Sequence, residues 1–197
     1  MMAAMRCGTD DGVGNGNVAI AGLGGLGSNI AIMLARAGVG TMLIVDFDTV
    51  EMSNLNRQHY DMTHIGMLKT EALKSQIAKI NPSVKVETKA VKVTGKNALG
   101  IFKDYDIVCE AFDDPRCKAA LVNALIGGGK RVVAASGMAG IGSSNNIVTK
   151  RAFRNLYVCG DHQISDGAEG FTAPRVVICA GHQANMVLRL LSGMEEE

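Results

Sequence analysis

Between residues 46 and 69 the sequence gathers polar and charged side chains that could bind a polyphosphate. They are Asp46, Asp48, Asn54, Arg57, Gln58 and Lys69, and most of them lie in the stretch D-F-D-T-V-E-M-S-N-L-N-R-Q. Fixed cations such as Arg57 and Lys69 can neutralise charge that moves between phosphates during a reaction. An enzyme that only transfers hydride has no use for them here, whereas an enzyme that handles a nucleoside triphosphate does. Either cation alone would suit a solvated surface, but the two together favour a functional site.

A glycine-rich turn, G-L-G-G-L-G, lies upstream of these residues. Gly22, Gly24 and Gly27 fit the pattern G-x-G-x-x-G, in which glycines allow a tight turn, close backbone approach to phosphate and close packing of helix on strand. Gly25 lies within the same turn. Asp46 comes 19 positions after Gly27, where a carboxylate can accept hydrogen bonds from ribose hydroxyls. The pattern therefore predicts a nucleotide-binding turn rather than a glycine turn without a ligand.

The elements around the turn predict how it is positioned. An apolar run at 18–21 indicates a buried parallel strand, and a helix over 26–37 would direct the unpaired N–H groups of its first turn at an anion. The alternation then continues along the chain. We expect strands at 41–45, 84–93, 107–109 and 131–135, helices at 67–80, 96–102, 116–126 and 174–191, a hairpin of 147–150 with 156–159, and loops at 136–146 and 160–173.

This order predicts an α/β fold: a Rossmann-like, doubly wound, largely parallel sheet with a C-terminal antiparallel extension and a closing helix. We expect one domain over 17–193, after a flexible N-terminal lead-in over 1–16. In such a sheet the chain reverses direction between the first and fourth strands, and ligands bind in the crevice there. The fourth strand runs into E-A-F-D-D, so Asp113 should lie opposite the glycine turn. It could hold Mg²⁺ together with phosphate oxygens, although Asp113 or Asp114 could instead cap the next helix.

Composition excludes several classes of partner. The chain has 197 residues and a net charge of +1, which argues against a nucleic-acid or membrane surface. Its apolar runs are too short to cross a bilayer. Five cysteines without a C-x-x-C pair, and histidines without metal-ligand spacing, argue against zinc and against a disulfide framework. With no hydrophobic signal core at the N-terminus, these features predict a protein of the reducing cytoplasm.

The sequence resembles the ThiF/MoeB group, the bacterial relatives of the catalytic domain of ubiquitin-activating enzymes. The resemblance lies in G-L-G-G-L-G-S-N, in the stretch from D-F-D to N-R-Q, in G-M-L-K, in I-N-P and in the segment around Asp113. Later segments, A-A-S-G-M-A-G, Y-V-C-G-D and A-P-R-V-V-I-C-A-G-H-Q-A-N-M-V-L-R, are similar to the short form of ThiF. That form adenylates the C-terminal glycine of ThiS, a ubiquitin-like sulfur carrier for thiamine thiazole synthesis.

The resemblance implies a role for each matching residue. Asp46 would bind ribose, with Asp48 beside it, Asn54, Arg57 and Lys69 would contact phosphates, Gln58 would support the site, and Asp113 would organise Mg²⁺. It also implies ATP as the nucleotide and a homodimer as the assembly. The loops at 136–146 and 160–173 would border a channel for the extended Gly-Gly tail of the carrier, with an ordinary mobile surface loop as the alternative.

The chain departs from the family pattern at several positions. Longer members carry an arginine in an N-terminal helix that reaches the partner's ATP, and only Arg6 stands in this region. Their zinc-binding C-x-x-C pairs are absent, and their Asp-Asn pair reads Asp113-Asp114. Cys159 is the best candidate for sulfur transfer, but a small buried hydrophobe is the preferred interpretation, as for Cys109 and Cys179.

Three alternatives stay open from the sequence. A NAD-dependent oxidoreductase would explain the glycine turn and Asp46 but would leave Asn54, Arg57 and Lys69 without a role. A sibling enzyme could activate another carrier or act in tRNA modification, as the tRNA threonylcarbamoyl-adenosine dehydratase does. A carrier-binding module without catalysis is the third.

Overall fold

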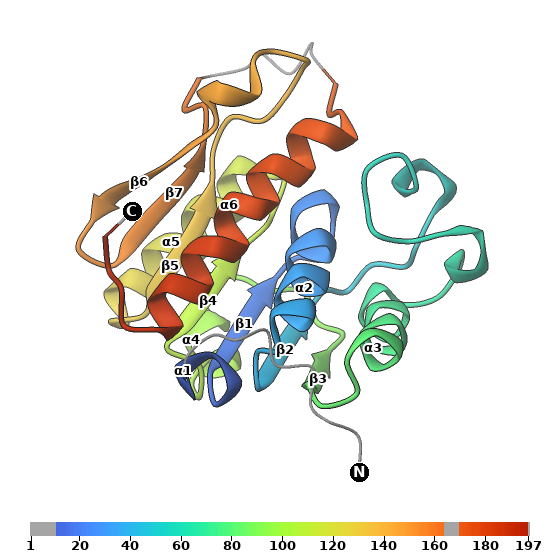
Figure 1. Ribbon diagram of the computed structural model, residues 1–197, viewed down its shortest axis with the longest axis horizontal. Helices are drawn as coiled ribbons and strands as arrows, with labels where there is room; N and C mark the ends of the chain where they lie inside the picture. The colour runs from blue at the N-terminus through green and yellow to red at the C-terminus, as the bar shows by residue number, and fades with distance from the viewer. Residues whose placement is uncertain (1–10, 164–169, 197) are drawn as a thin grey trace.

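The core of the protein is a seven-stranded sheet with the strand order β3-β2-β1-β4-β5-β7-β6 (Figure 1). The computed structural model describes residues 11–163 and 170–196. The strands are β1 (Asn17–Ala21), β2 (Thr41–Val45), β3 (Lys85–Lys89), β4 (Ile107–Glu110), β5 (Arg131–Ala135), β6 (Val148–Phe153) and β7 (Leu156–Gly160). All pairings are parallel except that of β6 with β7, which is antiparallel. The expected doubly wound sheet with an antiparallel extension is confirmed.

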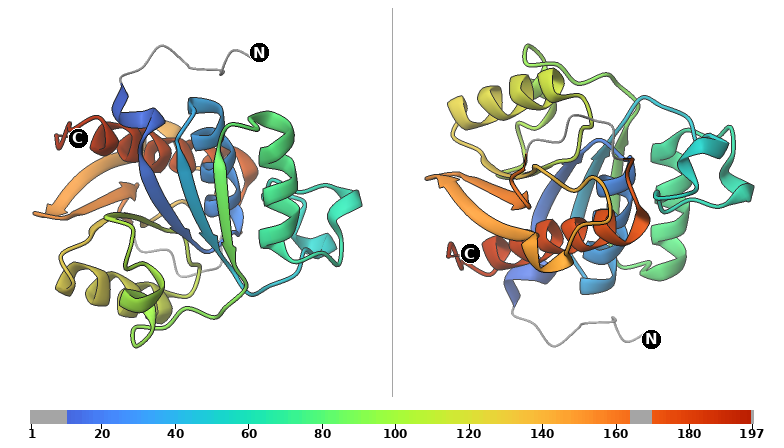
Figure 2. Two further views of the ribbon diagram at one scale, coloured as in Figure 1. Left: turned by 90° about the horizontal axis from the view of Figure 1, so that it is seen from below. Right: turned by 90° about the horizontal axis from the view of Figure 1, so that it is seen from above.

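Helices cover both faces of the sheet (Figure 2). They are α1 (Asp11–Gly14), α2 (Gly25–Ala37), α3 (Lys69–Ile80), α4 (Ala98–Ile101), α5 (Pro115–Gly127) and α6 (Ala173–Leu191), with short 3₁₀ helices at Met52–Asn54, Met62–His64 and Ser144–Asn146. One core lies between the sheet and α2, α3 and α6, and a second lies between the sheet and α4 and α5. Within the described part of the chain, no helix is long and apolar enough to cross a membrane.

The central strands β1, β2, β4 and β5 are buried on both faces, as the apolar runs in the sequence indicate. Along β1, Val18 and Ile20 face the core under α2 and α6, whereas Ala19 and Ala21 face the core under α5. This alternation follows from the two-residue period of a strand. The central strands therefore have no solvated face, and a ligand can reach them only at their ends.

The third strand is shorter than the sequence predicts. The expected strand over 84–93 ends at Lys89, which pairs with Val45, the last residue of β2. Because β2 ends there, the later residues have no ladder to join. Val91 and Val93 nevertheless continue the apolar alternation, since they pack against the core under α5 and line the pocket described below.

The lead-in expected over 1–16 also differs in the part that the structure describes. Residues 11–14 form α1, and Val13 is only 2% exposed. A Cβ built on Gly12 would lie 2.7 Å from the backbone oxygen of Leu191, so α1 rests against the end of α6. The remaining lead-in residues, 1–10, lie outside the described residues.

Candidate active site

A pocket of about 810 Å³ opens where the carboxyl ends of β1, β2, β4 and β5 meet. This is the crevice at the point of reversal between β1 and β4, where doubly wound sheets bind their ligands. The pocket brings together nine of the expected site residues, namely Gly22, Gly24, Gly25, Asp46, Asp48, Arg57, Gln58, Lys69 and Asp113. Gly27 and Asn54 do not line it.

The glycine turn has the geometry that its sequence predicts. Gly22 has a φ of +91°, a conformation that side chains disfavour. A Cβ on Gly27 would lie 1.8 Å from the carbonyl oxygen of Gly22, so this glycine lets α2 pack directly on the turn. A Cβ on Gly24 would meet only the Gln58 Nε2 atom, at 3.9 Å, so the space beside the α2 N-terminus is open. That opening is suited to an anion.

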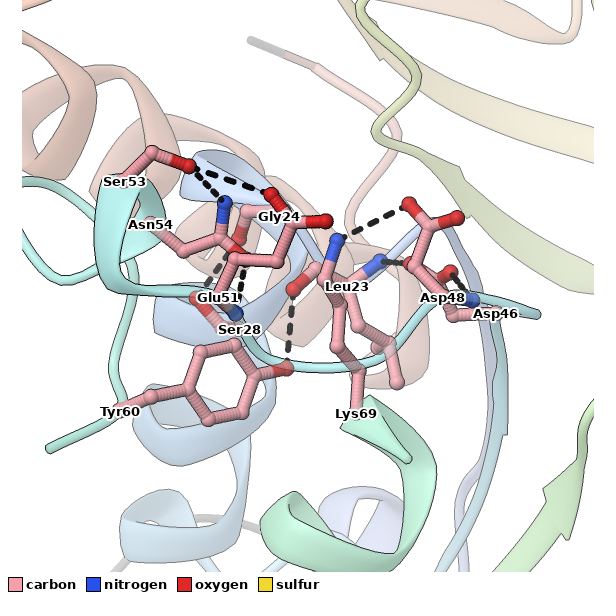
Figure 3. A network of polar contacts seen from close by, with 10 residues as sticks. All are labelled: Leu23, Gly24, Ser28, Asp46, Asp48, Glu51, Ser53, Asn54, Tyr60 and Lys69. Atoms are coloured by element: carbon pink, nitrogen blue, oxygen red, sulfur yellow. Dashed lines mark hydrogen bonds and ion pairs between the residues drawn. The ribbon is translucent and has the colours of Figure 1, made fainter. Parts of the chain in front are cut away.

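Asp46 is fixed by two backbone N–H groups. Leu23 N donates to its Oδ2 at 2.6 Å, and Asp48 N donates to its Oδ1 at 2.9 Å (Figure 3). These bonds hold the carboxylate beside the glycine turn. The Tyr60 hydroxyl donates to the Leu23 carbonyl at 2.9 Å, and its pKa is raised, first by burial and then by the charge of Asp46. Tyr60 therefore stays protonated and keeps donating to the turn.

The segment 47–68, which connects β2 to α3, is attached to α2 through two polar side chains that the sequence analysis did not single out. Ser28 accepts from His59 N at 2.9 Å, and Asn29 donates to the Arg57 carbonyl at 3.1 Å. Both are buried on a helix whose other buried residues are almost all apolar or glycine. Polar residues at helix positions that the apolar pattern predicts to be buried were a usable sequence signal, because a buried polar group needs a hydrogen-bond partner. These bonds set the backbone of residues 57–59 against the glycine turn.

The two expected cations lie in different environments. Lys69 is 6% exposed, and its Nζ donates to Asp48 Oδ2 at 3.0 Å. The Lys69 backbone N–H also donates to the Asp48 carbonyl, so Asp48 serves here to hold Lys69. Arg57 is half-buried, and its Nη1 donates to the Ser53 carbonyl and to Asn56. Lys69 is thus held rigidly in the pocket wall, whereas Arg57 is held by exposed neighbours.

Asn54 has a structural role that the sequence did not reveal. Its Oδ1 accepts from Glu51 N at 3.0 Å, and the two residues form a reciprocal cap on the 3₁₀ helix Met52–Asn54. Figure 3 shows Glu51, Ser53 and Asn54 in one polar network. The role of Asn54 in contacting phosphate stays a prediction.

The two consecutive aspartates differ in their surroundings, which separates the two roles considered above, helix capping and binding of Mg²⁺. Asp114 is the N-cap of α5, because its side chain accepts from Cys117 N at 2.7 Å, and this bond lowers its pKa. Asp113 is exposed, lines the pocket, and makes no hydrogen bond or ion pair with any residue that the structure describes. Asp113 therefore remains available to a cation at the pocket.

A buried ion pair at the end of β4 was not predicted from the sequence. Glu110 is fully buried, and Lys118, on the second turn of α5, donates to its Oε2. Burial raises the pKa of Glu110, and the nearby ammonium opposes that shift. Lys118 lines the pocket, as Lys92 does, so the wall carries two lysines besides Arg57 and Lys69. A long-range pair of this kind has no local sequence signal.

Cysteines and histidines contribute little to the pocket. Cys109, Cys159 and Cys179 are fully buried, and burial raises the pKa of Cys159 to about 11. They match the expectation of small buried hydrophobes. His182 is half-buried and hydrogen-bonded to Thr149. His162, two residues after the end of β7, has a φ of +58°.

The residues present fit a nucleotide and a cation. The Oε1 atom of Gln58 is buried in the pocket wall without a partner among the described residues. An unsatisfied buried acceptor of this kind indicates a missing donor. In the described ranges, no group of three or more His, Cys, Asp or Glu could hold a metal alone. Mg²⁺ needs only one or two carboxylates when phosphates supply its other ligands, and Asp113 can provide one.

Comparisons with known proteins identify the family of this chain. The model of the ThiF family matches residues 7–197. The adenylyltransferase and sulfurtransferase UBA4 of Kluyveromyces lactis is 42% identical over 125 residues, which are 63% of this chain and 28% of UBA4. UBA4 of Candida glabrata is 40% identical over 143 residues, which are 72% of this chain and 32% of that protein. The chain therefore spans about a third or less of these curated relatives.

Solved structures show the same fold. The E. coli tRNA N6-threonylcarbamoyladenosine dehydratase TcdA, in complex with AMP, superposes with a TM-score of 0.83 at 22% identity, covering 92% of this chain and 87% of TcdA. E. coli MccB with ATP superposes with a TM-score of 0.71 at 22% identity, covering 93% of this chain and 57% of MccB. Because the family model covers nearly all of the sequence, including every residue of the pocket wall, this chain belongs to the ThiF family.

Proposed function

We propose that the chain is an ATP-dependent adenylyltransferase that activates the C-terminal glycine of a ubiquitin-like sulfur carrier. One observation carries the proposal: the glycine turn and Asp46 share a single pocket with Arg57, Lys69 and Asp113. The first two suit any dinucleotide enzyme. Arg57, Lys69 and Asp113 suit a reaction in which charge moves between phosphates. Hydride transfer would not require them.

The reaction follows from what each group can do. The terminal carboxylate of the carrier attacks the α-phosphorus of ATP, a new C–O–P bond forms, and the bond from the α-phosphorus to the bridging oxygen breaks as pyrophosphate leaves. The carboxylate is already deprotonated at neutral pH, so the step needs no general base. Lys69 and Arg57 would stabilise the negative charge on the moving phosphates, and the rigid pocket would hold the reactants in line.

Nucleotide binding would use the end of the pocket beside β1 and β2. Asp46 would accept from the ribose hydroxyls, and the open α2 N-terminus beside Gly24 would receive phosphate. Asp113 would hold Mg²⁺, which supplies positive charge to the phosphate oxygens when it is bound. Gln58 would give its unpartnered Oε1 to a donor of the ligand.

The carrier tail would use the opposite end of the pocket. The wall there is made by the small residues Ser136, Gly137 and Ala139 with Met138 between them, and by Gly170 and Phe171. A Gly-Gly tail has no side chains, so close walls of small residues suit it. Gly140 is fastened there through its N–H to the Gly170 carbonyl and through its carbonyl to the Thr172 hydroxyl. This part of the loop is therefore held in place, which supports the channel over a mobile surface loop.

Within this reaction class we propose ThiS as the carrier, thiamine thiazole synthesis as the process and the cytoplasm as its place. We also propose a homodimer. The support for these finer assignments is the short-form ThiF pattern in the sequence. Sedimentation at micromolar concentration should show a dimer, and a monomer alone would contradict that assembly.

The direct test is ATP–pyrophosphate exchange with purified chain, Mg²⁺ and ThiS. We expect exchange that depends on ThiS and disappears with ThiS lacking its terminal glycine, since no carboxylate then reaches the α-phosphorus. Exchange that responds to another ubiquitin-like carrier, or to tRNA, would move the chain to a sibling activity. Calorimetric binding of NAD tighter than that of ATP would contradict the proposal.

A further inference from the structure

One buried guanidinium joins three segments beside the carrier end of the pocket. Arg175 lies in the first turn of α6 and is 4% exposed. Its Nη1 donates to the carbonyls of Gly142 and Ser143 at 2.6 and 3.0 Å, and its Nη2 pairs with Asp161 Oδ2 at 2.5 Å. The loop 136–146, the end of β7 and α6 are therefore fastened at one point.

Asp161 in turn shapes the part of the loop that lines the pocket. A Cβ on Gly137, whose φ is +79°, would lie 2.0 Å from Asp161 Oδ1. The backbone of Asp161 donates to the Gly137 carbonyl at 2.9 Å. A Cβ on Gly160 would lie 1.7 Å from the Ser136 carbonyl oxygen, so the two backbones touch. The position of residues 136–137 in the pocket wall thus depends on where the Asp161 carboxylate is held.

The helix that carries Arg175 is anchored independently of this pair. Gln183, fully buried on α6, donates to the carbonyls of Glu110 and Val133 at 2.9 and 3.1 Å. Val176 packs against the glycine turn, with its Cγ1 3.1 Å from where a Cβ of Gly25 would lie. Loss of the guanidinium should therefore release the loop while leaving α6 and the nucleotide end of the pocket in place.

We propose that Arg175 and Asp161 are positioning residues for the acyl substrate: they hold loop 136–146 at the separation that admits a glycine tail. This inference rests on the proposed function. Neither side chain lines the pocket, so both act through the backbone of the loop. The pair would set the affinity for the carrier and leave the affinity for the nucleotide unchanged.

The test compares Arg175→Lys and Asp161→Asn with the wild-type chain. Lysine keeps the charge but cannot make the forked contacts of arginine, and asparagine keeps the shape of the side chain but removes its charge. We expect the KM for ThiS in pyrophosphate exchange to rise about 10-fold or more, since a released loop must be ordered again each time the tail binds. The Kd for ATP should change less than about twofold, and kcat at saturating carrier should stay within about threefold.

A matched control is Arg151→Lys. Arg151 pairs with Glu195 at 3.2 Å, on β6 and away from the pocket. Its substitution should leave the KM for ThiS unchanged. An equal rise in the control, an unchanged KM in the two test variants, or a parallel loss of ATP affinity would overturn the inference.

Hydrogen exchange gives a second readout that needs no activity. In Asp161→Asn, amides of residues 137–146 should exchange faster, while those of β1 and α2 should not. Equal protection of the loop in variant and wild type would overturn the inference even if the KM had changed. A wild-type chain that exchanges pyrophosphate with no carrier would overturn the proposed function instead, which keeps the two failures distinct.

Discussion

Replacing Lys69 by methionine should separate catalysis from folding. The Lys69 ammonium has three N–H donors, and one of them binds Asp48, so two remain for phosphate oxygens. Removing a donor that stabilises charge in the transition state costs about 2.7 kcal/mol or more, which is a rate loss of about 100-fold. Methionine keeps most of the buried stem, so the pocket wall should stay filled.

The cost to folding should be much smaller. Asp48 is 49% exposed in its side chain, so water can solvate its carboxylate once the ammonium is gone. An ion pair with one solvated partner contributes about 1 kcal/mol or less, which corresponds to a melting temperature lower by about 2–4 °C in a domain of this size. The assays are carrier-dependent pyrophosphate exchange and thermal unfolding followed by circular dichroism.

The control is Lys85→Met, which breaks a pair with Glu87 on the outer strand β3. Exchange by this variant should match the wild type. The reasoning about Lys69 would be refuted if Lys69→Met kept more than about a third of the wild-type rate. It would also be refuted if the loss of rate followed a comparable loss of folded protein at the assay temperature.

Three further outcomes are expected. Gly27→Ala should fold poorly and bind no ATP, because its methyl group would lie 1.8 Å from a backbone oxygen. Gly24→Ala should fold normally, and equal melting temperatures for the two variants would contradict this expectation. Asp113→Asn should slow Mg²⁺-dependent exchange, whereas Asp114→Asn should lower stability and spare the rate. The pKa of Asp114 is lowered in the folded state, so its contribution to folding stability is present above pH about 4 and is lost as the pH falls through that lowered pKa. A wild-type chain that is still more stable than Asp114→Asn at pH 2 would contradict this expectation. Cys159 is fully buried with its pKa raised to about 11, so iodoacetamide should label it only after unfolding; rapid labelling of the folded chain, read by peptide mass spectrometry, would reopen a role in sulfur transfer.

The sheet and the nucleotide end of the pocket could be predicted because their signals are local. The apolar run before Gly22, the glycine spacing and Asp46 lie close together in the sequence, and each has a distinct conformational requirement. The boundaries of α2, α5 and α6 were expected within one residue of those observed. The predicted end of β3 was wrong because the length of a strand depends on its partner strand, and the partner β2 ends at Val45.

The remaining parts of the site depend on contacts between distant residues. Glu110 and Lys118 meet because α5 folds back on β4, and Arg175 meets Asp161 because α6 passes the end of β7. A charged residue in isolation is more often a solvated surface group, so the sequence offered no reason to single out these four. Asn54 was assigned to phosphate from its motif, and its contacts within the cap became visible only in the structure.

The position of β7 has a consequence for synthesis on the ribosome. β7 lies between β5 and β6 although it follows both in the chain, so a nascent chain that has reached residue 153 carries a β5 whose outer edge has no neighbour. Val176, which touches the glycine turn, emerges later still. Chains grow by roughly 5–20 residues per second, so the bare edge persists for seconds and is the stage at which incomplete chains would pair with one another. A stalled product ending near residue 150 should aggregate, whereas one that includes α6 should not.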